Sequence, residues 1–199
     1  MAAAPNDHKI RITRVSADFR SSPAGYDKAD DYIFAENFTE APTVFYRAAT
    51  STWYAVFGHC CCFCYQGSGL IVHTAAHPLG PWTAQAGGSP DADVVCTAPT
   101  AAEALGGVPT PGQGCLYAGS HDESATRAQA DFVATLPDGS GGETFLYYGG
   151  RWGQSPDGIK GHEPQYVTPL AFDAAGNVAR VTWQDSVAFD VDVGAPVGA

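Results

Sequence analysis

The stretch from Thr39 to His59, TEAPTVFYRAATSTWYAVFGH, decides the fold class of this 199-residue chain. It contains two runs rich in β-branched and aromatic residues, PTVFYR and WYAVFGH, and such runs are typical of β-strands. The segment AATST between them has the length of a hairpin loop. The stretch therefore predicts two adjacent antiparallel strands, with Glu40 at the beginning of the first.

Similar short runs lie on both sides of this hairpin, and helical periodicity is nearly absent. One strand, KIRITRVSADF, is expected at residues 9–19. Downstream, strands are expected in GLIVHTA and in HPLGPWTAQ, where Gly80-Pro81 forces a turn before a short edge strand. After a long loop the pattern resumes with ADFVATL, TFLYYGGRW, QYVTPLAF, VARVTWQD and, more weakly, VAFDVDV. FDAAGNVARV is predicted to be a hairpin with Gly176-Asn177 at its tip.

These runs form two sets of about four strands, at residues 40–85 and 129–184. Repeated four-stranded antiparallel units are typical of the blades of a β-propeller. A β-sandwich also contains many short strands. The pattern thus indicates an all-β protein and favours a propeller, while the sandwich stays open.

Composition excludes several classes of function. Hydrophobic residues make up 45% of the chain and aromatic residues 12%, which predicts a buried core rather than disorder. The formal charge of −11, with only 10 Lys and Arg residues, argues against nucleic acid or an anionic membrane as partner. The sequence contains no Ser-His-Asp order, phosphate loop or dinucleotide fingerprint.

Three groups of motifs resemble glycoside hydrolase family 43. The first is Glu40 directly before Ala-Pro, followed by a strand, a short loop and an aromatic strand. The second is HTAAHPLGPWT, which is similar to the family's recurring blade ending. The third comprises RAQADFVATL, FLYYGGRW and QYVTPLAFDAAGNVARVTW, which resemble the last blade of the branch that contains exo-β-1,3-galactanases.

The resemblance implies part of a five-bladed β-propeller, because it spans about Lys9 to Val191 but covers only the C-terminal half of the family's catalytic domain. It implies the end of blade three at residues 9–20, blade four at 40–85, a long loop at 86–126 and blade five at 127–191. The family's early blades, which carry its general-base aspartate and the aspartate that tunes the acid, have no counterpart. We therefore expect a fragment, a truncated product, or a protein completed by the missing blades or by another chain. Gly149-Gly150 also depart from the family, which has Gly-Asp before Arg-Trp.

The resemblance implies that Glu40 is the general acid of an inverting hydrolase and protonates the leaving oxygen. Pro42 is expected to hold Ala41 extended and so to fix the direction of Glu40. Gln129 matches the glutamine at which the galactanase branch departs from relatives that have an acidic base. Because a neutral amide is a poor proton acceptor, Gln129 is expected to position or activate water. From the residues alone, Glu40 is interpreted more readily as a surface glutamate, and a polar surface position is open for Gln129 as well.

Candidate sugar-binding residues flank the strands of the last blade and the loop after WYAVFGH. An aromatic platform with a charged neighbour suits a galactose ring, whose apolar face stacks while its hydroxyl groups form hydrogen bonds. The substrate-binding candidates are Tyr65, Gln66, Arg151, Trp152, Glu163 and Tyr166. Trp152 is also compatible with a place in the core. His162 is a candidate for contact with a central ion or water, or for a local hydrogen bond.

The cysteines are expected to form disulfides rather than a metal site. Structural zinc sites pair two short Cys/His motifs that lie a dozen or more residues apart, whereas four of the six cysteines here are crowded into residues 60–64. The expected bridges are Cys96 with Cys115 across the long loop, and Cys60 or Cys61 with Cys64. The Cys96–Cys115 bridge would contribute roughly 3 kcal/mol in the chain-entropy model.

The cysteine content and the resemblance predict a secreted or cell-wall protein. MAAAPNDHKIRITRV nevertheless lacks the apolar segment of a secretory signal. Asn37 begins a glycosylation sequon, NFT. The predicted function is hydrolysis of β-linked galactan with inversion, and the alternative is a non-catalytic carbohydrate-binding or adhesion module of the same fold. The expected partner is a polysaccharide or oligosaccharide, with no cofactor, although a structural calcium ion stays open.

Overall fold

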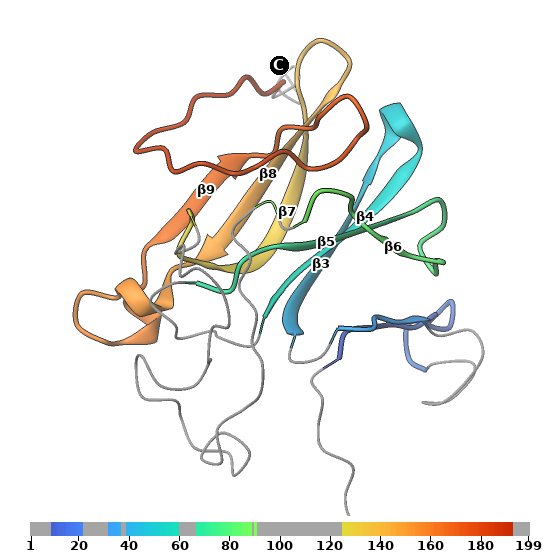
Figure 1. The fold of residues 1–199 in the computed structure, drawn as a ribbon, viewed down its shortest axis with the longest axis horizontal. Coiled ribbons are helices and arrows are strands. Elements are labelled where there is room, and N and C mark those ends of the chain that lie inside the picture. Colours follow the sequence, from blue (N-terminus) through green and yellow to red (C-terminus); the bar gives the residue numbers. More distant parts are fainter. Residues whose placement is uncertain are drawn as a thin grey trace, which may run out of the picture.

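A computed structural model of the chain describes residues 9–21, 32–36, 39–59, 67–88, 90 and 125–192. These residues form three antiparallel β-sheets, and their helical residues belong to three short 3-10 helices (Figure 1). The described part of the chain contains no helix that is long and apolar enough to cross a membrane. The predicted all-β class is therefore confirmed.

The first sheet contains four strands in the order β3-β4-β5-β6. Their bounds are Thr39–Arg47 for β3, Thr52–His59 for β4, Ile71–Ala75 for β5 and Thr83–Ala84 for β6. The 3-10 helix η1, Ala48–Thr50, and Ser51 with a left-handed φ of 51° connect β3 to β4. The two strands pair in antiparallel register, with Phe45 opposite Tyr54, so the hairpin predicted at residues 39–59 is confirmed.

The second sheet contains three strands in the order β7-β8-β9. Their bounds are Gln129–Pro137 for β7, Glu143–Gly150 for β8 and Gln165–Pro169 for β9. Asp138 stabilises the turn from β7 to β8, because its Oδ1 accepts the backbone N–H groups of Ser140 and Gly142. The 3-10 helices η2, Trp152–Gln154, and η3, Lys160–His162, lie in the connection from β8 to β9.

The prediction of one strand over residues 9–19 is wrong. Only Arg11–Ile12 form a strand, β1, which pairs with an unpredicted two-residue strand, β2, at Tyr32–Ile33. A turn at residues 17–18 ends the extended segment. There the Ser16 hydroxyl donates a hydrogen bond to Asp18 Oδ1. Apolar side chains between this ribbon and the first sheet form a small core of Ile10, Phe34, Ala55, Phe57, Ala75 and Trp82.

The main core lies between the first and second sheets, which meet where β3 and β7 run side by side (Figure 1). Phe45 of β3 stacks on Tyr54 of β4 with 4.9 Å between ring centroids, and Phe145 of β8 lies 5.0 Å from Phe45. The Tyr54 hydroxyl donates to the Gly176 carbonyl oxygen at 2.6 Å. Buried aromatic rings therefore join residues that are far apart in the sequence.

The expected fourth strand of the last blade, VARVTWQD, does not form. The chain does turn at Gly176-Asn177, where Phe172 and Val178 form an isolated bridge, so the predicted hairpin tip is present. Beyond it, the Val178 N–H donates to Gln85 Oε1 and the Val181 N–H to the Pro90 carbonyl oxygen. These bonds direct the segment toward the first sheet instead of the edge of β9. Residues 187–192, the described part of VAFDVDV, are likewise outside any strand.

The described residues do not close a propeller. They provide two sheets with the antiparallel, sequential strand order of propeller blades, packed face to face through the main core. The number of five blades stays a prediction from the resemblance.

Candidate active site

Glu40 and Gln129 meet at the place where β3 and β7 begin. Glu40 is the second residue of β3 and Gln129 is the first residue of β7. Gln129 Nε2 donates a hydrogen bond of 2.8 Å to Glu40 Oε1, although the two residues are 89 positions apart. The structure thus brings together the two residues that the sequence predicts as catalytic. Glu40 is half-buried and Gln129 is buried.

A β-bulge sets the direction of the Glu40 side chain. The register of β3 and β4 shifts between Glu40 and Thr43, and Ala41 has a φ of 56°. The expectation that Pro42 holds Ala41 extended is therefore wrong. A left-handed alanine costs on the order of 1 kcal/mol or more, and such strain is common at functional sites. Bulges of this kind turn a side chain away from the regular alternation of a strand.

The segment at residues 67–70 ties the end of β4 to the residue that precedes β7. The Ser68 N–H donates to the Ala128 carbonyl oxygen, and the Ser68 carbonyl accepts the N–H of His59. Gly58, the cross-strand partner of Glu40, fits closely against this segment, because a Cβ atom at Gly58 would lie 2.6 Å from Ser68 Cβ. The backbone near Glu40 and Gln129 is thus also connected through Ser68, which bonds β4 on one side and Ala128 on the other.

A histidine–glutamate pair that sequence reasoning missed braces the chain just before β3. His73 Nε2 and Glu36 Oε1 lie 2.7 Å apart, and the His73 ring packs on Phe34 and Phe57 in the smaller core. His59, opposite Thr39, has a lowered pKa because burial penalises the charged imidazolium, an effect that the charge of Glu36 partly offsets. Glu36, His59 and His73 are far apart in the sequence, and no motif there indicates that they lie close together in the fold.

Arg151 and Trp152 lie next to Gly150, the cross-strand partner of Gln129. The Arg151 guanidinium carbon is 4.7 Å from the centroid of the Trp183 ring, and Lys160 Nζ is 3.3 Å from the centroid of Trp152. Cation–aromatic contacts of this length are attractive and fix the side chains relative to each other. The structure therefore places both predicted sugar-binding residues at the same end of the second sheet as Gln129.

The other two candidates of the last blade differ in exposure. Glu163 is half-buried, and its Oε1 accepts from Gln165 Nε2 at 3.4 Å. Tyr166 is only 4% exposed, its ring stacks on Trp183, and its hydroxyl donates to the Thr182 carbonyl oxygen. Tyr166 therefore lies in the core and supports Trp183, which is 45% exposed and was not among the sequence candidates.

Asp131 is a further residue that sequence reasoning missed. It lies two residues after Gln129, in a bulge of β7 between Ala130 and Phe132. Partial burial raises the pKa of its carboxyl, the charge of Glu163 raises it further, and Lys160 and the Gly150 N–H oppose these effects. The sequence around Asp131 does not indicate these neighbours, because Lys160 and Glu163 belong to the connection from β8 to β9.

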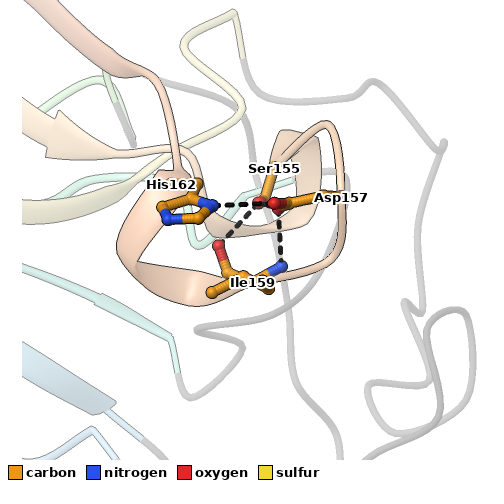
Figure 2. Close-up of polar contacts among 4 residues, drawn as sticks. All are labelled: Ser155, Asp157, Ile159 and His162. Carbon is orange, nitrogen blue, oxygen red and sulfur yellow. Dashed lines mark hydrogen bonds and ion pairs between the residues drawn. The ribbon is translucent and has the colours of Figure 1, made fainter.

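His162 belongs to a hydrogen-bonded loop between β8 and β9 (Figure 2). Its Nδ1 lies 2.7 Å from Asp157 Oδ2, while Asp157 Oδ1 accepts the Ile159 N–H at 3.0 Å and the Ser155 hydroxyl at 3.1 Å. The His162 side chain is 61% exposed. The structure thus shows that His162 makes a local hydrogen bond, one of its two predicted roles. Its contact with a central ion or water stays a prediction.

We expect this loop to loosen when Asp157 is removed or protonated. The hydrogen bond from His162, followed by those from Ile159 and Ser155, lowers the pKa of Asp157 from its ordinary value of 3.8. The contribution of Asp157 is therefore complete above pH 3.8 and is lost as the pH falls through the lower folded value. Asp157→Ala should speed amide hydrogen exchange of Ile159 by about 2- to 10-fold at pH 6. Asp190→Ala, at an exposed site, is the control, and equal exchange in both variants would contradict the assignment.

Several predicted residues lie outside the described part of the chain. They are Tyr65 and Gln66 of the predicted sugar site, Asn37 of the sequon, and the cysteines Cys60, Cys61, Cys64, Cys96 and Cys115. Their predicted roles stay predictions. Among the residues that the structure does describe, no group of three or more His, Cys, Asp or Glu side chains is arranged to hold a metal ion.

Comparison with protein-family models and with curated protein sequences finds no match. Solved structures do match. One is a glycoside hydrolase family 43 β-1,3-galactosidase with galactodeoxynojirimycin, which has a TM-score of 0.56 and 16% identity over 91% of this chain and 40% of its own. A second is an exo-β-1,3-galactanase variant from Phanerochaete chrysosporium with β-1,3-galactotriose, with a TM-score of 0.53 and 17% identity over 88% of this chain and 30% of its own.

A third solved structure is the exo-β-1,3-galactanase from Clostridium thermocellum, with a TM-score of 0.54 and 13% identity over 87% of this chain and 29% of its own. The chain thus spans well under half the length of the proteins that it matches. At these identities the likeness concerns the fold. The resemblance read from the sequence is confirmed at that level: this chain shares its fold with part of the glycoside hydrolase family 43 β-1,3-galactosidases and galactanases.

Proposed function

We propose that this chain is a glycoside hydrolase module that acts on β-linked galactan with inversion. The observation that carries the proposal is the contact of Glu40 with Gln129 at the start of β3 and β7. The fold is shared with β-1,3-galactosidases and galactanases, two of which are described with galactose-like or galactan ligands. A carboxyl group and an amide at this position provide a proton donor and a hydrogen-bonding partner for it.

Glu40 is proposed to protonate the glycosidic oxygen as the bond to the sugar breaks. Gln129 bonds Oε1 of Glu40 and leaves Oε2 as the oxygen that carries the proton. An amide suits this role because its Nε2 donates to Glu40 Oε1 both when the carboxyl is ionised and when Oε2 carries the proton. Gln129 can therefore hold Glu40 in place before and after proton transfer. Arg151 and Trp152 are proposed to contact the sugar from the second sheet.

The same contact also favours the alternative, a carbohydrate-binding module without catalysis. In inverting glycosidases the acid and the base are about 6.5–9.5 Å apart, because a sugar carbon and a water molecule lie between them. Glu40 and Gln129 touch at 2.8 Å and so do not span such a gap. If no other group supplies the base, the module would bind galactan without cleaving it.

The test combines turnover and binding on the 199-residue chain. β-1,3-Galactotriose is incubated with the protein, released galactose is measured by chromatography, and binding is measured by calorimetry. Release of galactose, with the α-anomer as the first product by proton NMR, supports an inverting hydrolase. Binding without release supports the alternative. If the chain neither releases galactose nor binds the trisaccharide, both proposals are overturned.

A further inference from the structure

The second sheet is apolar on both of its faces. Its inner face contributes Phe145, Tyr147 and Tyr166 to the main core. Its outer face follows from the strand register, because residues paired across neighbouring strands point to the same side of a sheet. None of the outer-face residues is charged. They are Phe132, Ala134 and Leu136 of β7, Thr144, Leu146 and Tyr148 of β8, and Val167 and Pro169 of β9.

This outer face presents aromatic rings to its surroundings. Phe132 is 48% exposed, and its ring stacks on Tyr148 with 4.3 Å between centroids and 11° between the ring planes. Tyr148 and Val167 are half-buried, and Leu146, two residues before Tyr148, is buried. None of the outer-face residues belongs to either core that the described residues form. An antiparallel sheet with one face in water alternates apolar and polar side chains, so this sheet is built to be covered on both faces.

The first sheet has cover on both faces. One face contributes Phe45 and Tyr54 to the main core, and the opposite face contributes Ala55 and Phe57 to the smaller core under the β1–β2 ribbon. The cores formed by the described residues thus cover both faces of the first sheet, at least in part, but only the inner face of the second. Each chain therefore has one sheet face that lacks a partner in these cores.

Charge favours this face for contact between two copies of the chain. Each copy has a formal charge of −11, so two copies repel each other unless they meet through surfaces without charge. The outer face meets this requirement. A carboxylate lies at its end, because Gly150 shares the side of Tyr148 and a Cβ atom there would be 3.2 Å from Asp131 Oδ2. An apolar centre with a polar margin is the usual composition of a protein interface.

We propose that the outer face of the second sheet binds the same face of a second copy of this chain. One uncovered face per chain leads to a closed dimer, because no such face remains after two copies have met. Two-fold dimers in which one patch pairs with itself are the commonest oligomers of soluble proteins. The two sheets would pack face to face about 10 Å apart, with the Phe132–Tyr148 pairs between them. This inference does not depend on the proposed function, since it makes no use of Glu40.

The dimer is expected to be weak. Three strands about 4.8 Å apart, with about five residues of about 3.3 Å each, give a face of roughly 15 by 17 Å. This face is smaller than the roughly 800 Å² that each partner buries in a standard interface. The fraction of dimer should therefore rise gradually with protein concentration.

Sedimentation velocity on the 199-residue chain tests the proposal. The protein is measured in reducing buffer over about a hundredfold range of concentration, so that disulfide-linked species do not contribute. The wild-type chain should shift from its monomer mass of 20.8 kDa toward twice that mass as the concentration rises. A dimer that is present only without reductant would be a disulfide product and would overturn the proposal.

Substitutions identify the surface that mediates the contact. Phe132→Glu should raise the Kd of the dimer by about 10-fold or more, because it places an unpaired charge in an apolar interface. Phe132→Leu keeps the position apolar and should still dimerise. Val44→Glu is the matched control, because Val44 is 41% exposed on the outer face of the first sheet and lies outside the proposed interface. This variant should dimerise like the wild-type chain.

Three other results would overturn the proposal. A wild-type chain that stays monomeric at every concentration would leave the outer face to a different polypeptide, such as a further sheet of the propeller fold. Dimerisation that Phe132→Glu does not weaken would place the contact on another surface. Dissociation by both Phe132→Glu and Val44→Glu would indicate a head-to-tail contact between the two sheets instead of a self-paired face. Circular dichroism shows whether each variant folds, and Tyr148→Lys replaces Phe132→Glu if that variant does not.

Discussion

Glu40→Gln should lower the turnover of β-1,3-galactotriose by about 10²- to 10⁴-fold, the usual contribution of a general acid. The substitution keeps the size of the side chain and an oxygen that accepts from Gln129 Nε2, so the contact between β3 and β7 can persist. In the proposed mechanism, what it removes is the proton for the leaving oxygen. The measurement is the initial rate of galactose release at several pH values.

Glu143→Gln is the matched control, because Glu143 is exposed and its Oε2 accepts the Ala48 N–H, which a glutamine oxygen can also do. This variant should release galactose at the wild-type rate and bind the trisaccharide equally well. Equal rates for Glu40→Gln and the wild-type chain would remove Glu40 from the mechanism. Unchanged binding with lost turnover would assign Glu40 to the chemical step.

Phe45→Ala should destabilise the fold by about 3–5 kcal/mol, the usual cost of truncating a buried phenylalanine. Phe45 is 4% exposed, stacks on Tyr54 and contacts Phe145 of the second sheet at 5.0 Å. The cavity left by alanine would therefore lie at the interface of the two sheets. The free energy of unfolding, measured by urea denaturation, gives the magnitude.

Tyr46→Ala is the control on the same strand, because successive residues of a strand point to opposite faces. Tyr46 is 38% exposed and contacts Trp53 at 5.0 Å, so its loss should cost about 1 kcal/mol or less. A cost for Phe45→Ala no larger than that for Tyr46→Ala would show that the two sheets do not depend on this aromatic cluster.

Strand periodicity predicts the fold well where strands are long. The runs at β3, β4, β5, β7, β8 and β9 alternate or cluster β-branched and aromatic residues, and all of them form strands. The pattern fails where pairing depends on distant partners. β1 and β2 have two residues each, too few to show a period. Val178 and Val181 look like a strand, but their backbone N–H groups bond Gln85 and Pro90, which follow β6.

The candidate site was predictable in part. Glu40 and Gln129 were identified through motifs, yet nothing in the sequence shows that they touch, because that contact depends on how two sheets pack. Tyr166 was expected to face the sugar, but a tyrosine beside a strand is equally suited to the core, and tertiary packing on Trp183 decides it. Asp131 carries no motif, and its raised pKa comes first from partial burial and then from the charge of Glu163, in the connection from β8 to β9.

The hydrogen bond between Glu40 and Gln129 has a thermodynamic consequence for the whole molecule. Its two side chains belong to different sheets, so a sugar that contacts both residues also acts as a cross-link between the sheets. A ligand that binds only the folded chain stabilises it by about 2.7 kcal/mol at a concentration of 100 times its Kd. Sugar binding and folding are therefore linked: the sugar should raise the free energy of unfolding, and a variant that loses affinity for the sugar should lose that increase.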